Sequence, residues 1–189
     1  MRLEHGIDLG YCTNIHRGET WAETFSGLRE HTDAVRRRVS PDAPYGIGLR
    51  LGAAAAGELS ADRKLRDDFR RWLEERNAYV FTINGFPYGT FHGSRVKELV
   101  YAPDWTTPER LAYTLRLFDL IDEFAPPGES VSVSTLPGSF KEFIRPGSDQ
   151  VETIHRQLRA CGEYLDRLRD RTGRDLHLGL EPEPLGLFE

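Results

Sequence analysis

Large apolar residues alternate with small or polar residues in five short segments of the chain. Because successive side chains of a strand point to opposite faces, this alternation predicts five strands. They cover Ile7–Cys12, Tyr45–Leu51, Tyr79–Asn84, Ser130–Thr135 and Leu176–Glu181. Each strand is therefore expected to have one apolar face and one polar face.

Apolar residues recur at helical spacing between these strands. The predicted helices run from Trp21 to Val35, from an N-cap at Ser60 to Leu73, from Thr107-Pro108 to Phe118, and from Val151 to Thr172-Gly173. Proline is favoured at the first position of a helix, and glycine just after its end. The run Ala53–Ala56, which stands between glycines, is predicted to be a loop or a short turn.

Strands that alternate with helices predict an α/β fold with a parallel sheet. Strands with one polar face favour the wall of a (β/α) TIM barrel over an open sheet covered by helices on both sides. A complete barrel has eight strands in about 250 residues, whereas residues 1–189 contain five predicted strands. We therefore expect a single domain that is an incomplete barrel of about five β/α units, the N-terminal portion of a longer protein. Self-association through the exposed sheet edges is the alternative.

Composition narrows the class of partner. The net charge of −5 argues against nucleic acid or an anionic membrane surface. No apolar run has the length of a membrane span, and the first residues lack the apolar core of a signal peptide. Cys12 and Cys161 show neither metal-ligand spacing nor a disulfide framework. These features predict a cytoplasmic protein with reduced thiols.

Polar residues gather where the predicted strands end, at the rim where TIM barrels carry their chemistry. We predict that this rim binds a substrate through Asn14, His16, Arg50, Asn84, Tyr88 and Lys141. His16 is also compatible with an ordinary surface histidine. Arg50, on a polar strand face, needs an anionic partner. That partner is either Asp8 or Glu181 of the chain, or a carboxylate or phosphate of a ligand.

The last predicted strand ends in a carboxylate. Glu181 is followed by Pro182 and Pro184, and proline cannot continue a sheet ladder. Glu181 is therefore a candidate catalytic residue, together with His92, although a loop histidine such as His92 is often only a surface residue. Glu183 is two residues further along and would point to the same face as Glu181. It is equally compatible with a site residue and with a solvent-exposed loop. His177 is predicted to be a core histidine.

The loop after the third predicted strand combines glycines with Phe86, Tyr88 and Phe91. Aromatic rings on a barrel rim can stack against a sugar-like ligand, and glycines let the backbone approach it. A hydrophobic cluster that fixes the loop explains the same residues equally well. No glycine-rich dinucleotide motif, Walker loop, serine-hydrolase elbow or zinc-protease motif is present, which disfavours those classes.

Several of these segments together resemble the EboE metabolite-traffic family, over essentially the whole chain. The segments are Gly10–His16, Asn84–Gly89, Phe91–Gly93, Val100–Trp105 and Thr135–Lys141. That family is more remotely similar to the xylose-isomerase-like TIM barrels, a link that rests on strand order and on Leu178–Pro182.

In the wider superfamily, a divalent metal (Mn, Mg, Zn or Co) is held by carboxylates and a histidine at the ends of successive strands. The resemblance places the first metal ligand at Glu181, with Glu183 as a second candidate, and the remaining ligands beyond Glu189. It implies a metal-dependent isomerase or epimerase that acts on a sugar or polyol in secondary-metabolite processing. The alternative is a module that binds or carries the metabolite without turnover.

Overall fold

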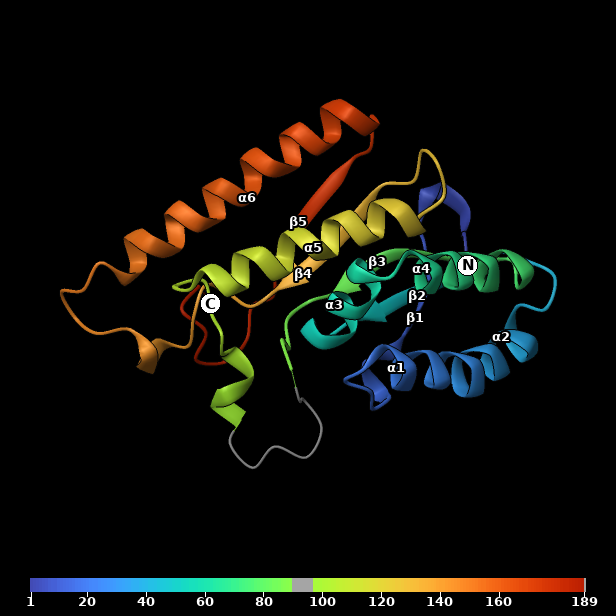
Figure 1. Ribbon diagram of the computed structural model, residues 1–189, viewed down its shortest axis with the longest axis horizontal. Coiled ribbons are helices and arrows are strands. Elements are labelled where there is room, and N and C mark those ends of the chain that lie inside the picture. The colour runs from blue at the N-terminus through green and yellow to red at the C-terminus, as the bar shows by residue number, and fades with distance from the viewer. Residues whose placement is uncertain (90–96, 189) are drawn as a thin grey trace.

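The computed structural model describes residues 1–89 and 97–188, and all its named strands form one sheet. The sheet is parallel, with the order β1-β2-β3-β4-β5 (Figure 1). The strands are β1 (Gly10–Cys12), β2 (Tyr45–Arg50), β3 (Ala78–Asn84), β4 (Val131–Thr135) and β5 (Leu176–Leu180). The α/β class with a parallel sheet is confirmed, and the architecture is compatible with part of a β/α barrel.

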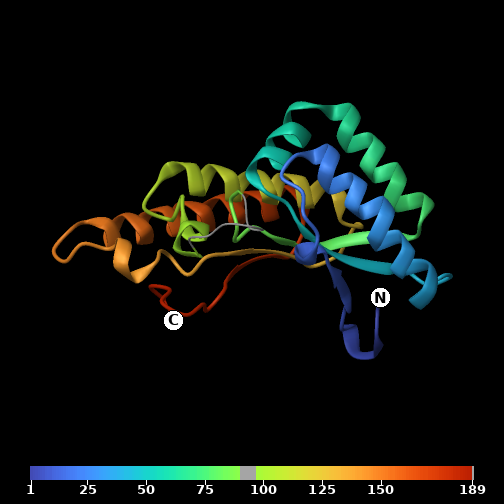
Figure 2. The ribbon, with the colours of Figure 1, turned by 90° about the horizontal axis from the view of Figure 1, so that it is seen from below.

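The helices lie on one side of this sheet, and the N-terminal segment lies on the other (Figure 2). They are α1 (Trp21–Gly27), α2 (Asp33–Val39), α3 (Ala53–Ala61), α4 (Arg63–Glu75), α5 (Pro108–Phe124) and α6 (Gln150–Thr172). Thr107 occupies the N-cap position of α5 ahead of Pro108, as predicted, and α6 ends at Gly173 in the left-handed conformation. None of the helices in the described ranges combines the length and the apolar content that a bilayer crossing needs.

The helical side of the sheet contains the hydrophobic core. Ile47, Leu49, Ile83 and Val133 are fully buried there, and α5 packs against β3 and β4. The opposite face carries half-exposed polar side chains, among them Thr82 and Ser132, whose hydroxyl oxygens are 2.8 Å apart. The prediction of one apolar and one polar face per strand is therefore confirmed for most of the sheet.

The third strand departs from simple alternation, because a β-bulge shifts its register. Ile47 of β2 pairs with Val80, but the next residue, Gly48, pairs with Thr82. The extra residue, Phe81, points to the polar face, where a Cβ atom on Gly10 would lie 2.8 Å from its ring. Strict alternation along the predicted strand Tyr79–Asn84 puts Phe81 on the same, apolar, face as Ile83, and this expectation was wrong. A bulge turns a side chain to the other face without any signature in the apolar pattern.

The first predicted strand is also shorter than expected. Ile7 and Leu9 are 58% and 50% exposed, and the chain before β1 forms a hairpin instead. In this hairpin, backbone hydrogen bonds of 2.8 Å join Leu9 N–H to the Met1 carbonyl and Leu3 N–H to the Ile7 carbonyl. Backbone pairing within the hairpin replaces the first half of the predicted strand Ile7–Cys12, so Ile7 and Leu9 do not lie on the apolar face of the sheet.

Three further local predictions were wrong. The run Ala53–Ala56 begins α3, because alanine is the strongest helix former even without an apolar stripe. The N-cap of the following helix is consequently Asp62, which accepts a 2.8 Å hydrogen bond from Lys64 N–H, and not Ser60. His177 is exposed and lies 2.9 Å from Asp175, since nothing in the described chain covers its face of β5.

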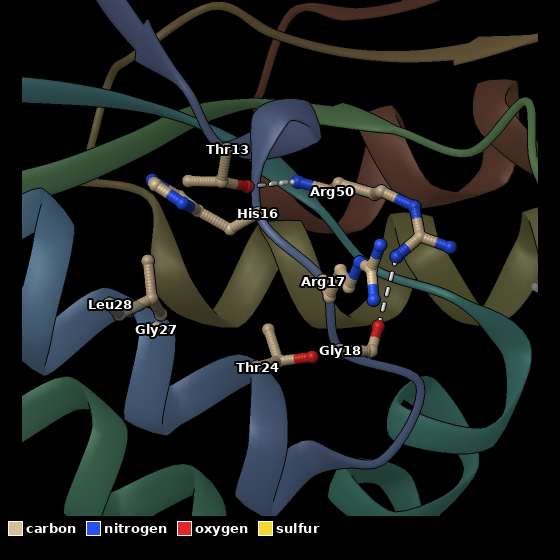
Figure 3. Close-up of a pocket in the computed structure, with 8 residues that line it drawn as sticks. All are labelled: Thr13, His16, Arg17, Gly18, Thr24, Gly27, Leu28 and Arg50. Atoms are coloured by element: carbon tan, nitrogen blue, oxygen red, sulfur yellow. Dashed lines mark hydrogen bonds between the residues drawn. The ribbon is translucent and has the colours of Figure 1, made fainter. Parts of the chain in front are cut away.

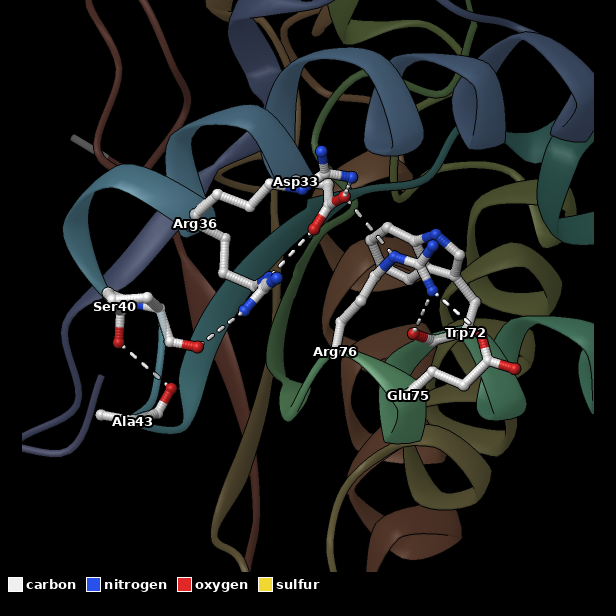
Figure 4. A network of polar contacts seen from close by, with 9 residues as sticks. Asp33, Arg36, Ser40, Ala43, Trp72, Glu75 and Arg76 are labelled. Carbon is white, nitrogen blue, oxygen red and sulfur yellow. Dashed lines mark hydrogen bonds and ion pairs between the residues drawn. The ribbon is translucent and has the colours of Figure 1, made fainter.

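A buried carboxylate joins α2 to α4 (Figure 4). Asp33 is 2% exposed and forms ion pairs with Arg36, Arg37 and Arg76 at 2.9, 2.6 and 3.7 Å. Burial alone raises the pKa of Asp33, but the hydrogen bonds from Arg36 and Arg37 outweigh it and lower this pKa. Asp33 therefore remains ionised and fixes the outer helices relative to each other.

Candidate functional site

Three neighbouring strands bring polar side chains together at their carboxyl ends. Asn84 of β3 pairs in register with Ser134 of β4, and Ser134 pairs with Gly179 of β5. Glu181 follows β5 on the same face, and its N–H donates to the Thr135 carbonyl at 2.9 Å. The strand register therefore places Glu181 beside Asn84 and Ser134, and we call these three residues the β3–β5 site.

The Asn84 amide links the strand end to the carboxylate. Its Nδ2 donates to Glu181 Oε1 at 3.2 Å, and its Oδ1 accepts from Phe86 N–H, also at 3.2 Å. Because the Phe86 N–H is a donor only, Oδ1 must face it, and the amide donor is left for the carboxylate. The expected proximity of Asn84 and Glu181 is thus present in the structure.

Burial raises the pKa of Glu181, and the negative charge of Glu183 adds to this rise, whereas hydrogen bonding from the Ser134 side chain opposes it. A carboxylate with a raised pKa that lies among other polar side chains is a candidate functional group. Glu183 itself is half-buried, in a turn where its carbonyl accepts from Gly186 N–H at 2.8 Å.

The pKa shift of Glu181 predicts a pH-dependent effect on stability. A carboxyl group with a raised folded-state pKa stabilises the fold while it is protonated, and this contribution is lost as pH rises through that pKa. We expect Glu181→Gln to raise the free energy of unfolding at neutral pH by a few tenths of a kcal/mol, because the group is only half-buried. Urea unfolding should show the difference vanishing below about pH 4. Glu163→Gln, on the exposed surface of α6, should show none; an equal gain there would contradict the assignment.

A divalent metal finds few ligands at this site. Glu181 and Glu183 are the two carboxylates concerned, and residues 1–89 and 97–188 contain no cluster of three histidine, cysteine or acidic side chains able to hold a metal ion. The described donors therefore do not form a metal centre by themselves, and the predicted metal gains no support from them. His92, the predicted catalytic partner, lies outside the described residues.

Arg50 connects two loops. Its Nη1 donates to the Gly18 carbonyl at 2.9 Å (Figure 3). Its Nη2 donates to Glu19 Oε1 at 3.1 Å and to the Gly89 carbonyl at 2.9 Å. The side chain is 3% exposed. Its carboxylate partner is Glu19, rather than Asp8 or Glu181. Arg50 therefore fixes the loops after β1 and β3, and these bonds occupy both terminal nitrogens of its guanidinium.

Asn14 and His16 follow β1, which is at the opposite edge of the sheet from β5. His16 stacks on His31 with ring centres 4.5 Å apart, and its Nε2 is 2.8 Å from the Tyr11 hydroxyl. Beside it lie a cavity of about 10 Å³, room for about one water molecule, and an open groove of about 470 Å³. We call this groove, which is lined by His16 and His31, the β1 groove. The predicted site residues are therefore divided between the β3–β5 site and the region around the β1 groove.

The remaining predicted residues lie elsewhere. Tyr88 packs edge-on against Tyr113 at 5.0 Å, and Phe86 packs against Tyr101 at 5.2 Å. The rings of Phe86 and Tyr88 belong to a hydrophobic cluster behind the strand ends, in agreement with the alternative interpretation for these two residues. Phe91, the third aromatic residue of this loop, lies outside the described residues. Lys141 is exposed. Its backbone N–H donates to the Leu185 carbonyl at 2.9 Å, and this bond joins the loop after β4 to the C-terminal segment.

Sequence reasoning did not select Ser134 or the buried Arg110 as site residues. Ser134 could have been found from its place on the polar face of a predicted strand, next to the strand of Glu181. Arg110 had no such signal, because a lone arginine in an amphipathic helix normally faces solvent.

Comparison with known proteins adds no relative: no protein-family model, no curated protein and no solved structure matches this chain. Membership of the EboE family therefore stays a prediction that rests on the sequence segments given above.

Proposed function

We propose that the chain binds a small, polyhydroxylated, sugar-like metabolite on the polar face of the sheet, with the Glu181 carboxylate as the main contact. The observation that supports this most strongly is the half-buried carboxylate of Glu181, held by the Asn84 amide at the carboxyl ends of parallel strands.

The chemistry of the polar face suits such a ligand. Adjacent hydroxyl groups of a polyol both donate and accept hydrogen bonds, and a carboxylate beside an amide and a serine offers both functions. Further along the face, Thr82 and Ser132 add two hydroxyl groups. Gly48 and Gly179 have no side chain beyond a hydrogen atom, which leaves the polar face open at these two positions.

An isomerase or epimerase of the xylose-isomerase-like type is the second candidate. The raised pKa of Glu181 favours it, since a carboxylate with a pKa nearer neutrality transfers protons more effectively. Because the described residues lack a metal centre, we place binding first and assign no step to a metal. The cytoplasmic location also stays a prediction.

Titration of the protein with D-xylose, D-fructose and myo-inositol, followed by saturation-transfer NMR, tests the proposal. We expect at least one of the three to bind at millimolar concentration. Glu181→Gln should weaken that binding about tenfold or more, since a hydrogen bond to a charged group contributes about 1.5–3 kcal/mol. Glu163→Gln on α6 is the matched control and should bind normally. Absence of binding by all three, or equal affinity in Glu181→Gln, would reject the proposal.

Solvent deuterium separates the two candidates. Incubation of the protein with D-fructose or D-xylose in deuterated water should leave the sugar carbons unlabelled if the chain only binds its ligand. Incorporation that Glu181→Gln abolishes would establish the isomerase-type candidate instead.

A further inference from the structure

Arg110 is the most deeply buried charged residue of the described chain. It lies in the first turn of α5 and is 0% exposed. Burial lowers its pKa to about 10, and the charge of Asp104 opposes this, so the guanidinium remains positive at neutral pH. Burying a cation costs free energy unless it makes specific contacts. The contacts that offset this cost therefore indicate the structural role of Arg110.

Two of these contacts are backbone carbonyls from different loops. Nε donates to the Pro103 carbonyl and Nη1 donates to the Gly85 carbonyl, both at 2.8 Å. The guanidinium carbon also lies 5.6 Å from the centre of the Tyr88 ring and 5.4 Å from that of Tyr113. Two aromatic rings and two carbonyls thus fix the plane of the guanidinium.

The Gly85 carbonyl connects Arg110 to the β3–β5 site. This carbonyl and the N–H of Phe86 belong to the same planar trans peptide group, and they point in opposite directions. Arg110 holds the oxygen end of this group, while the N–H end donates to Asn84 Oδ1. The orientation of the peptide therefore decides which way the Asn84 amide faces.

That orientation determines the donor presented to the carboxylate. With Oδ1 held by Phe86 N–H, the Nδ2 of Asn84 faces Glu181. If the peptide rotated, Asn84 would lose the contact that distinguishes its oxygen from its nitrogen. A fork-shaped guanidinium can hold two carbonyls at once, whereas an ammonium group on a flexible stem lacks this geometry.

We propose that Arg110 is a positioning residue for the β3–β5 site. Through the Gly85–Phe86 peptide, Arg110 orients the Asn84 amide toward Glu181. The sugar-like ligand in this inference is taken from the proposed function. The orientation of the Asn84 amide can be measured in the protein without any ligand. Arg110 touches neither Glu181 nor the open face, so its role is indirect.

NMR of labelled protein tests this inference with the variants Arg110→Met and Arg110→Lys. In both, we expect the side-chain amide signals of Asn84 to shift or broaden, because neither replacement can hold both carbonyls. Affinity for the sugar that binds the wild type should fall roughly tenfold in Arg110→Met. Arg116→Met, on the same helix, is the matched control and should leave the Asn84 signals and the affinity unchanged.

Unaltered Asn84 signals and affinity in folded Arg110→Met would overturn the inference. If circular dichroism shows that Arg110→Met does not fold, Arg110→Lys, which keeps the charge, replaces it. Unaltered Asn84 signals in folded Arg110→Lys would then overturn the inference. If none of the three sugars binds the wild type, the proposed function fails, and the Asn84 signals still decide whether Arg110 orients the amide.

Discussion

Replacement of Phe69 by alanine is expected to lower the free energy of unfolding by about 4 kcal/mol, the largest effect that we predict for a single substitution. Phe69 is fully buried on α4, and its ring meets four other aromatic rings. The distances between ring centres are 5.0 Å to Trp21, 6.0 Å to Phe25, 6.1 Å to Trp72 and 4.9 Å to Phe124. Loss of this ring leaves a cavity where α1, α4 and α5 meet.

Urea denaturation followed by tryptophan fluorescence measures this effect. Phe143→Ala is the control, because Phe143 is only partly buried and its ring stacks edge-on against Phe140 at 5.2 Å. We expect its loss of stability to be less than half that of Phe69→Ala. Equal losses for the two variants would show that the aromatic cluster is not the centre of the core.

Gly85→Ala is expected to cost about 3 kcal/mol, at the upper end of the range for overpacking. A Cβ atom on Gly85 would lie 2.5 Å from Leu117 Cδ1 and 2.9 Å from the Ser134 carbonyl. The second clash is with backbone, and Gly85 N–H already donates to that carbonyl at 3.0 Å, so the strand ends would have to separate. The substitution should therefore disturb the β3–β5 site as well as the fold.

Gly89→Ala provides the matched control, because a Cβ atom there would meet nothing within 4 Å. Thermal unfolding should show a clearly lower midpoint temperature for Gly85→Ala than for the wild type. For Gly89→Ala, the free energy of unfolding should change by no more than about 0.5 kcal/mol. Similar midpoints for the two variants would contradict the close packing of β3 against β4 and α5.

Alternating residues predicted the bounds of β2, β4 and β5 well because one face of the sheet is packed by helices and the other is not. β2, β4 and β5 lie within one residue of the predicted ends at each terminus. The same alternation failed for Ile7 and Leu9, where a local hairpin competed with the sheet, and for Phe81, where a bulge changed the facing of the side chain. Hairpins and bulges are set by backbone pairing, which the apolar pattern does not encode.

The candidate site was predictable where strand register alone determines position. Asn84 and Glu181 each end a strand of one parallel sheet, so their proximity follows from the topology. Arg50 was placed correctly at the end of β2, but its long side chain reaches the loop carbonyls of Gly18 and Gly89. The direction of a long side chain depends on loops whose course the strand pattern does not define.

Chemical-shift mapping tests most directly whether the β3–β5 site is the working part of this molecule. Labelled protein is titrated with whichever of D-xylose, D-fructose and myo-inositol binds, and the shifts of backbone and side-chain amides are followed. We predict that the largest shifts belong to the Asn84 side-chain amide and to the backbone N–H groups of Phe86 and Glu181. Largest shifts at His16 and His31 in the β1 groove, with Asn84 and Glu181 unchanged, would contradict the assignment.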